Sequence, residues 1–215
     1  MGVLSCHRNT AMGYMSHRVR SPVMARWQPG ATERLVVAAV ELFTERGYDD
    51  TTVAQIAERA GLTKSTFFRH FSDKRELLVA GQQTLSTLLA DGIADAPSDA
   101  TPLEAVAAGL KRASSEMGPT NRELGPRIKA AVAASTELRE RDALKSVGLA
   151  AAMTTALTDR GVPAPTAHVA AELGVLAFKQ GYARWSESDS TDDPGLAHHA
   201  LAALGELRSA TSTLG

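Results

Sequence analysis

Apolar residues recur at helical spacing along most of the chain beyond residue 30. From Thr32 to Arg46 they fall three or four residues apart, and Gly47 ends the repeat. Ala and Leu are abundant, whereas long β-branched runs are absent, which favours helices over strands. The pattern therefore predicts an all-α fold.

Two short helices follow this first one. Thr52 and Gln55 have the form of a capping box that opens a helix, and Gly61 breaks the helix. Thr63 can cap the next short helix, which runs to Phe71. A short helix, a glycine turn and a second short helix have the spacing of a helix-turn-helix motif.

Longer helices are predicted in the rest of the chain. The first opens at Ser72 or Asp73 and runs through Leu89, so that the two halves of the protein share a rigid element. Gly125-Pro126 is expected to kink or split one of the later helices. These later helices are predicted near residues 103–117, 121–134, 136–160, 165–187 and 194–209.

Three regions result from this pattern. Residues 1–30 lack periodicity and are interpreted as a flexible basic arm. Residues 31–76 form the predicted N-terminal three-helix domain with the helix-turn-helix. Residues 77–215 form the predicted C-terminal helical-bundle domain.

Charge is distributed unevenly along the 215 residues. Residues 1–80 contain 11 basic and 8 acidic residues, a net charge of +3, whereas the remaining chain has a net charge of −4. A basic N-terminal part on an acidic body suits a polyanionic partner, although ordinary scatter in composition also produces an imbalance of this size.

The second helix of the motif has an apolar side and a polar side. Ile56, Phe67 and Phe71 are expected to bury the motif against the first helix. The outward side then carries hydroxyls and cations of the kind that reach phosphates and base edges in the major groove. Its residues are Thr63, Lys64, Ser65, Thr66, Phe68, Arg69 and His70.

The run from Ala31 to Leu78 resembles the tetracycline-repressor (TetR) family of transcriptional regulators. The resemblance covers about a quarter of the chain by motif, and the helical remainder is similar only in length and pattern. The matching segments are Ala39-Val40-Glu41-Leu42-Phe43, Glu45-Arg46-Gly47-Tyr48, Thr51-Thr52-Val53-Ala54-Gln55-Ile56-Ala57, Ala60-Gly61-Leu62-Thr63-Lys64-Ser65-Thr66-Phe67 and Arg69-His70-Phe71-Ser72-Asp73-Lys74.

The resemblance implies a ligand-released repressor that binds a double-stranded palindromic operator. It implies a phosphate contact at Thr52, base or phosphate contacts at Lys64, Ser65 and Thr66, and backbone contacts at His70 and Lys74. Phe68 stands where the family often has Tyr, so it is expected to meet a thymine methyl or to pack partly inward. The basic arm is expected to reach the minor groove or phosphates through Arg18, Arg20 and Arg26.

A homodimer is expected because two-fold dimers read palindromic sites. The last two predicted helices are the candidates for its interface, and the resemblance implies a four-helix bundle across the two-fold axis. The alternative is that these helices belong to the core of one chain. The candidate residues are Val169, Leu173, Leu176, Ala177, Gln180, Leu196, Leu201 and Leu204.

An effector pocket is predicted among the helices between residues 77 and 185. A small hydrophobic effector is expected, because few charged positions are predicted to point inward. The same positions would equally suit a solid core. The candidate lining residues are Leu85, Leu89, Leu110, Met117, Ile128, Val132, Leu149, Met153, Leu157, Phe178, Tyr182 and Trp185.

Other classes of function fit less well. His168, His198, His199 and many carboxylates raise the alternative of an enzyme, but no metalloprotease, nucleophile-elbow, phosphate-loop or cysteine-cluster motif is present. We therefore expect no catalytic residue, no cofactor and no metal. A helical interaction protein without DNA binding, and an activator instead of a repressor, stay open as alternatives.

Location is predicted from what the chain lacks. It has one cysteine, Cys6, so it cannot form an intrachain disulfide, and this suits a reducing compartment. No apolar stretch is long enough for a membrane span or resembles a signal peptide. A cytoplasmic protein without a membrane partner is expected.

Overall fold

The computed structural model describes residues 30–213, and this part of the chain is helical without any β-strand, which confirms the all-α prediction. The predicted arm therefore lies outside the described residues except for Gly30. In chain order the helices are α1 (Ala31–Arg46), α2 (Val53–Arg59), α3 (Lys64–His70), the 3₁₀ helix η2 (Lys74–Val79), α4 (Gln82–Ala94), α5 (Pro102–Ser115), α6 (Pro119–Ala134), α7 (Thr136–Asp159), α8 (Ala164–Glu187) and α9 (Leu196–Thr211).

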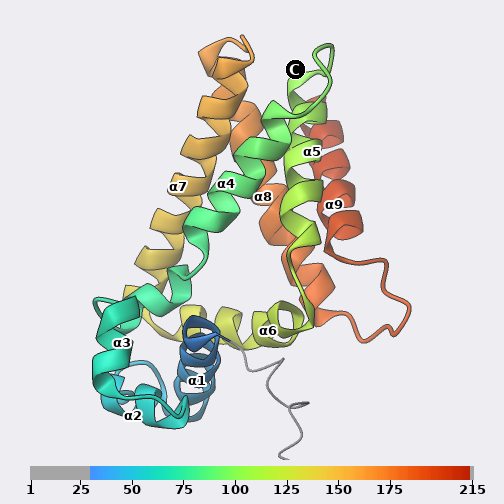
Figure 1. The fold of residues 1–215 in the computed structure, drawn as a ribbon. Helices are drawn as coiled ribbons and strands as arrows, with labels where there is room; N and C mark the ends of the chain where they lie inside the picture. The colour runs from blue at the N-terminus through green and yellow to red at the C-terminus, as the bar shows by residue number, and fades with distance from the viewer. Residues whose placement is uncertain (1–29, 214–215) are drawn as a thin grey trace, which may run out of the picture.

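Helices α1, α2 and α3 form a small unit at one end of the molecule (Figure 1). Leu35 and Phe43 on α1 are buried, and the Tyr48 ring packs edge-on against Phe43 with 5.2 Å between centroids. The guanidinium of Arg59 on α2 forms a bidentate ion pair with Glu45 on α1 at 2.8 Å. Packing and charge together fix α2 against α1.

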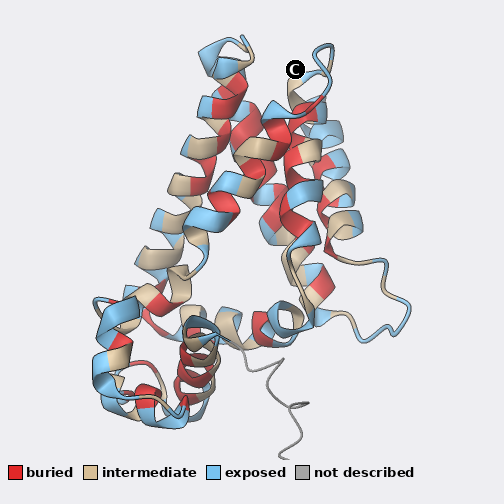
Figure 2. Cartoon of the chain, viewed as in Figure 1, coloured by how far each residue is buried: buried red, intermediate tan, exposed pale blue. Residues whose placement is uncertain are grey.

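The C-terminal helices form a bundle, and α6 crosses its base (Figure 1). Helix α8 packs against α5, α6, α7 and α9. Buried residues gather inside this bundle and along α1, with exposed residues on the outer faces (Figure 2). Within residues 30–213 no helix is long and apolar enough to cross a membrane.

The junction between the two units differs from the predicted continuous helix. Gly81 has a φ of 78°, in the left-handed region, and it separates η2 from α4. The prediction of one rigid helix from Asp73 to Leu89 is therefore wrong. The apolar spacing continues across Gly81, which is why the pattern concealed the break.

Of the kink or split predicted at Gly125-Pro126, the split does not occur, because α6 runs on through Pro126. Gly125 lies so close to α8 that an added Cβ would be 2.5 Å from the Ser186 Cβ. The Arg122 guanidinium donates to the carbonyls of Trp185 and Ser188 at 3.1 and 2.6 Å. These contacts with α8 and the segment after it hold α6 in place around the proline.

Two buried hydrophobic clusters stabilise the described chain. One occupies the bundle of α4, α5, α7, α8 and α9, and the other fills the N-terminal unit. The N-terminal cluster also includes Ala131 from α6 and Leu138 from α7. The bundle thus supplies apolar contacts to the helix-turn-helix unit, and the two units do not pack independently.

Candidate nucleic-acid interface and ligand cavity

Helices α2 and α3 form the predicted helix-turn-helix. Gly61, with a φ of 66°, makes the turn between them. Ile56 and Phe67 are fully buried, and Ala57 is 1% exposed where the helices approach. This apolar side fixes the orientation of α3 and leaves its other side in solvent.

The exposed side of α3 carries cations, hydroxyls and one aromatic ring. Lys64, Ser65 and Arg69 are exposed, and α3 contains no acidic residue. Phe68 is 51% exposed, and the Lys64 ammonium lies 5.8 Å from the centroid of its ring. Of the two orientations expected for Phe68, the structure has the outward one.

Each of the two threonine caps makes hydrogen bonds that stabilise the start of its own helix. The Thr63 hydroxyl accepts from the Thr66 backbone N–H at 3.1 Å. Thr52 forms the predicted capping box, in which its hydroxyl accepts from the Gln55 N–H and its own N–H donates to the Gln55 side chain. A phosphate contact at Thr52 would have to share these atoms with the cap.

Lys74 and His70 differ in how far they are available to DNA. The Lys74 ammonium donates to the carbonyls of Tyr48 and Thr51 at 2.6 and 3.0 Å, and it lies 4.0 Å from the centroid of the Tyr48 ring. His70 is exposed, with its Nδ1 3.3 Å from the Thr32 hydroxyl. Lys74 is therefore committed to an internal anchor, while His70 faces solvent.

The arm residues predicted to contact DNA are Arg18, Arg20 and Arg26, and they lie outside the described residues.

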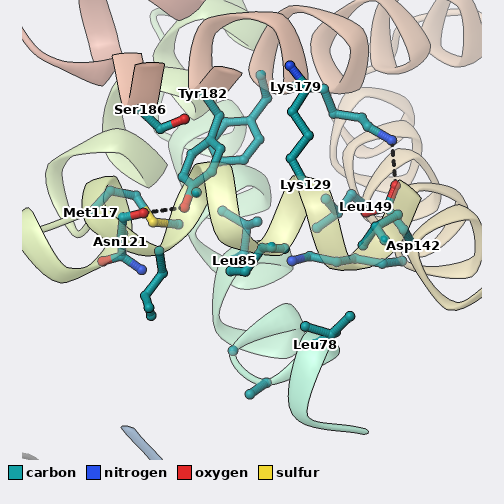
Figure 3. Close-up of a pocket in the computed structure, with 18 of the residues that line it drawn as sticks. Leu78, Leu85, Met117, Asn121, Lys129, Asp142, Leu149, Lys179, Tyr182 and Ser186 are labelled. Carbon is teal, nitrogen blue, oxygen red and sulfur yellow. Dashed lines mark hydrogen bonds and ion pairs between the residues drawn. The ribbon is translucent and has the colours of Figure 1, made fainter. Parts of the chain in front are cut away.

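A cavity of about 570 Å³ lies where the bundle meets the N-terminal unit. Helices α4, α6, α7 and α8 form most of its wall (Figure 3). Leu77, Leu78 and Gly81 at the junction line it as well, and Val36 reaches it from α1. The cavity therefore touches the segment that connects the two units.

Seven of the predicted pocket residues line this cavity and five do not. Leu89, Leu110, Met153, Leu157 and Trp185 are buried in the bundle core, so their assignment to the pocket is wrong. Their side chains fill the spaces between helices instead of bordering a void. The lining residues are Leu85, Met117, Ile128, Val132, Leu149, Phe178 and Tyr182.

The expectation that few charges point inward is also wrong. Lys129, Asp142, Lys145 and Lys179 line the cavity together with Glu116. Sequence reasoning missed them because polar positions on α6, α7 and α8 look like solvated helix faces. Tyr182 also borders the cavity, and burial raises the pKa of its phenol to about 12. Its hydroxyl donates to the Asn121 carbonyl at 2.5 Å.

Ion pairs join the cavity wall to the segment after α3. The Arg141 guanidinium on α7 pairs with the Glu76 carboxylate on η2. Arg75 on η2 lies 3.3 Å from the Glu137 carboxylate on α7. A movement of α7 would therefore pull on the 3₁₀ helix that follows the helix-turn-helix.

The predicted dimer residues separate into two groups. Ala177, Leu196 and Leu204 are buried inside this chain, so they cannot face a partner in this structure. Val169 and Leu176 on α8 are 56% and 43% exposed. Leu173, Gln180 and Leu201 are partly exposed.

The arrangement defines a helix-turn-helix protein with a helical bundle and an internal cavity behind the motif. Residues 35–80 match the model of the bacterial regulatory proteins of the tetR family. Over this region the chain is similar to TetR-family regulators.

Sequence relatives match the N-terminal part of the chain. The transcriptional regulator TcmR of Streptomyces glaucescens is 33% identical over 79 residues, which cover 37% of this chain and 35% of TcmR. The transcriptional activator FasR of Mycolicibacterium smegmatis is 40% identical over 63 residues, or 29% of each chain. The chain thus spans only about a third of the length of these relatives.

Solved structures agree over more of the fold. A TetR-family regulator from Syntrophomonas wolfei matches with a TM-score of 0.56 over 86% of this chain and 96% of that chain, at 15% identity. One from Mesorhizobium loti matches with a TM-score of 0.52 over 84% of this chain and 96% of that chain, at 19% identity. These likenesses concern the fold alone.

Proposed function

We propose that the protein is a DNA-binding repressor that acts as a homodimer on a palindromic operator and is released by a small, largely apolar effector. The observation that carries this proposal is the exposed side of α3. A short helix on a rigid apolar support presents Lys64, Arg69 and an outward Phe68 without any acidic residue. Such a surface suits the major groove, where cations meet phosphates and guanine edges and an apolar ring meets thymine methyls.

The homodimer is supported by the outward stripe on α8. Val169, Leu173, Leu176 and Gln180 fall three or four residues apart, so they share one helix face. Two large apolar side chains on that face are exposed in the single chain. Burial of this stripe against a second copy would place two α3 helices on one DNA duplex.

Control by an effector is supported by the position of the cavity. Its wall includes Leu77 and Leu78 of η2, and η2 is tied to α7 by Arg141 and Glu76. A ligand that fills the cavity better in one arrangement of these elements shifts the population toward that arrangement. Repression requires that the ligand-bound arrangement spaces the two α3 helices wrongly for DNA.

The first experiment selects a binding site from a random double-stranded library and measures affinity by fluorescence anisotropy across a salt titration. Wild-type protein should bind the selected palindrome with strong salt dependence. Lys64→Ala with Arg69→Ala should weaken binding by about tenfold or more and lower the salt slope by about two.

Lys111→Ala is the matched control, because Lys111 is an exposed lysine on α5. Equal affinity of the α3 double variant and the Lys111 variant would contradict DNA reading by α3. A reporter gene behind the selected site separates repression from activation.

A further inference from the structure

The cavity has a charged region within an otherwise largely apolar wall. Lys129, Lys179 and Asp142 lie toward one side in Figure 3, while Met117 and Asn121 lie toward the other. Leu85, Ile128 and Phe178 are among the apolar residues that complete the wall. A ligand that fits this lining would have one polar end and an apolar body.

Two of the three lysines at the cavity already have acidic partners. The Lys179 ammonium pairs with the Asp142 carboxylate at 2.8 Å and also lies 3.3 Å from the Ser146 hydroxyl. The Lys129 ammonium pairs with the Glu187 carboxylate at 2.6 Å. These two cations are neutralised by the protein itself.

Lys145 on α7 is the exception. Within residues 30–213 its ammonium makes no hydrogen bond or ion pair, although the residue is partly buried and lines the cavity. Burial lowers the pKa of this ammonium; Asp142 opposes the shift, and Lys179 adds to it. A buried cation without a partner loses its hydration and makes no compensating hydrogen bond or ion pair. An anion beside it would therefore stabilise it.

We propose that the effector is an amphipathic anion whose carboxylate binds the Lys145 ammonium while its apolar tail lies against Leu85, Ile128 and Phe178. This inference rests on the proposed effector control and specifies the chemical class of the effector. It replaces a purely hydrophobic ligand with one that carries a single negative charge.

The charges of the lining favour an anion over the other classes. Within residues 30–213, Lys129 and Lys179 are already paired with Glu187 and Asp142, which leaves Lys145 as the lining cation without a partner. A cationic ligand would be repelled by Lys145, and a neutral ligand would leave this ammonium without a partner. A carboxylate gives a charge-assisted hydrogen bond, which is stronger than a neutral one.

Lys145 is well placed to transmit the effect of ligand binding from the cavity to the helix-turn-helix unit. Lys145 and Arg141 are four residues apart on α7, so they are neighbours on one side of the helix. Arg141 pairs with Glu76 on η2. A head group held by Lys145 therefore acts on the part of α7 that is bound to the junction.

The test compares decanoate with 1-decanol, which has the same chain length and no charge, by isothermal titration calorimetry on the full chain. Wild-type protein should bind decanoate about tenfold or more tightly than decanol, as expected for a hydrogen bond to a buried charged group. Lys145→Met should remove this preference by weakening decanoate and leaving decanol unchanged or tighter. Lys145→Arg, which keeps the charge, should retain a preference for decanoate.

Lys111→Met serves as the matched control, because it removes an exposed lysine far from the lining. Undiminished decanoate preference in the Lys145→Met protein would overturn the proposal, and so would a wild-type protein that binds neither compound. Lys145→Gln provides a second neutral variant if Lys145→Met folds poorly by circular dichroism.

Anisotropy with the selected DNA, measured on the same proteins, keeps the two proposals apart. If DNA binding is intact and the carboxylate preference is absent, only the anion inference fails. If the preference is present and no variant or wild-type protein binds DNA, the proposed function fails and the ligand class stands.

Discussion

At the scale of single residues, Lys74 shows how a cation can serve the fold instead of a ligand. Its ammonium joins the start of η2 to the loop between α1 and α2 through the carbonyls of Tyr48 and Thr51. The Tyr48 ring covers the same ammonium. The ammonium is thus the donor to two loop carbonyls.

Lys74→Met should therefore lower the free energy of unfolding by about 1–2 kcal/mol, because hydrogen bonds from a charged donor are lost. The Tyr48 carbonyl keeps its bond from the Thr51 backbone N–H, whereas the Thr51 carbonyl loses the Lys74 ammonium as its donor. Urea denaturation followed by circular dichroism measures the change. Lys64→Met, on the exposed side of α3, should change stability by less than about 0.5 kcal/mol. Equal effects of the two substitutions would mean that the Lys74 anchor contributes nothing.

The sequence could predict the caps at this scale but not the anchor. Thr52 and Thr63 act on N–H groups three residues away, so local spacing is enough to identify them. The Lys74 ammonium reaches carbonyls 23 and 26 residues away, and that contact depends on the packing of η2. For Lys74, resemblance indicated a DNA contact where the structure has an internal one.

At the scale of elements, Gly81 decides how the two units are connected. Its left-handed backbone lets α4 leave in a new direction after η2, and an added Cβ would meet nothing within 4 Å. A side chain at this position would therefore affect stability through backbone strain and not through a steric clash.

Gly81→Ala should lower the free energy of unfolding by about 1–2 kcal/mol through this strain. Gly205→Ala is the matched control, because Gly205 lies inside α9 with open space around it, and there alanine should stabilise by about 0.5–1 kcal/mol. Thermal unfolding at one protein concentration compares the two variants. A stabilised Gly81→Ala protein would show that η2 and α4 can join into the continuous helix that the periodicity predicts.

Helix positions were largely predictable, whereas their continuity was not. Apolar period and capping residues are local, so they locate α1, α2 and α3 to within a residue or two. Interruptions depend on what packs against the helix. Contacts with α8 hold α6 together at Pro126, while nothing in the apolar spacing marks the break at Gly81.

At the scale of the whole molecule, the exposed stripe on α8 connects the proposed dimer with the proposed binding of DNA. Val169→Glu with Leu176→Glu should convert a dimer into monomers, because burying two carboxylates against a two-fold copy of themselves is costly. Size-exclusion chromatography with light scattering measures the mass, and binding to the selected palindrome should fall in parallel.

Leu144→Glu is the control for this prediction. Leu144 is 58% exposed on α7 and lies outside the α8 stripe. If the α8 double variant keeps the mass of the wild type, or if Leu144→Glu alone yields monomers, the interface lies elsewhere.

The cavity is the feature that the sequence could place least well. An apolar residue on a helix looks the same whether it fills a core, as Leu110 and Met153 do, or borders a void, as Leu85 and Ile128 do. Only the tertiary arrangement separates these cases. The same is true of Lys145, whose position on α7 is indistinguishable by pattern from a solvated lysine.

The shared wall at Leu77 and Leu78 has a consequence for how such a protein can change over generations. These side chains border the cavity and also belong to the element that supports the helix-turn-helix. If the protein acts as the proposed repressor, a substitution there that admits a new ligand should also alter its affinity for DNA in the absence of ligand. Descendants with new ligand preferences should therefore carry most of their changes at Thr84, Leu85 and Leu88 on α4, which line the cavity and lie outside the N-terminal cluster.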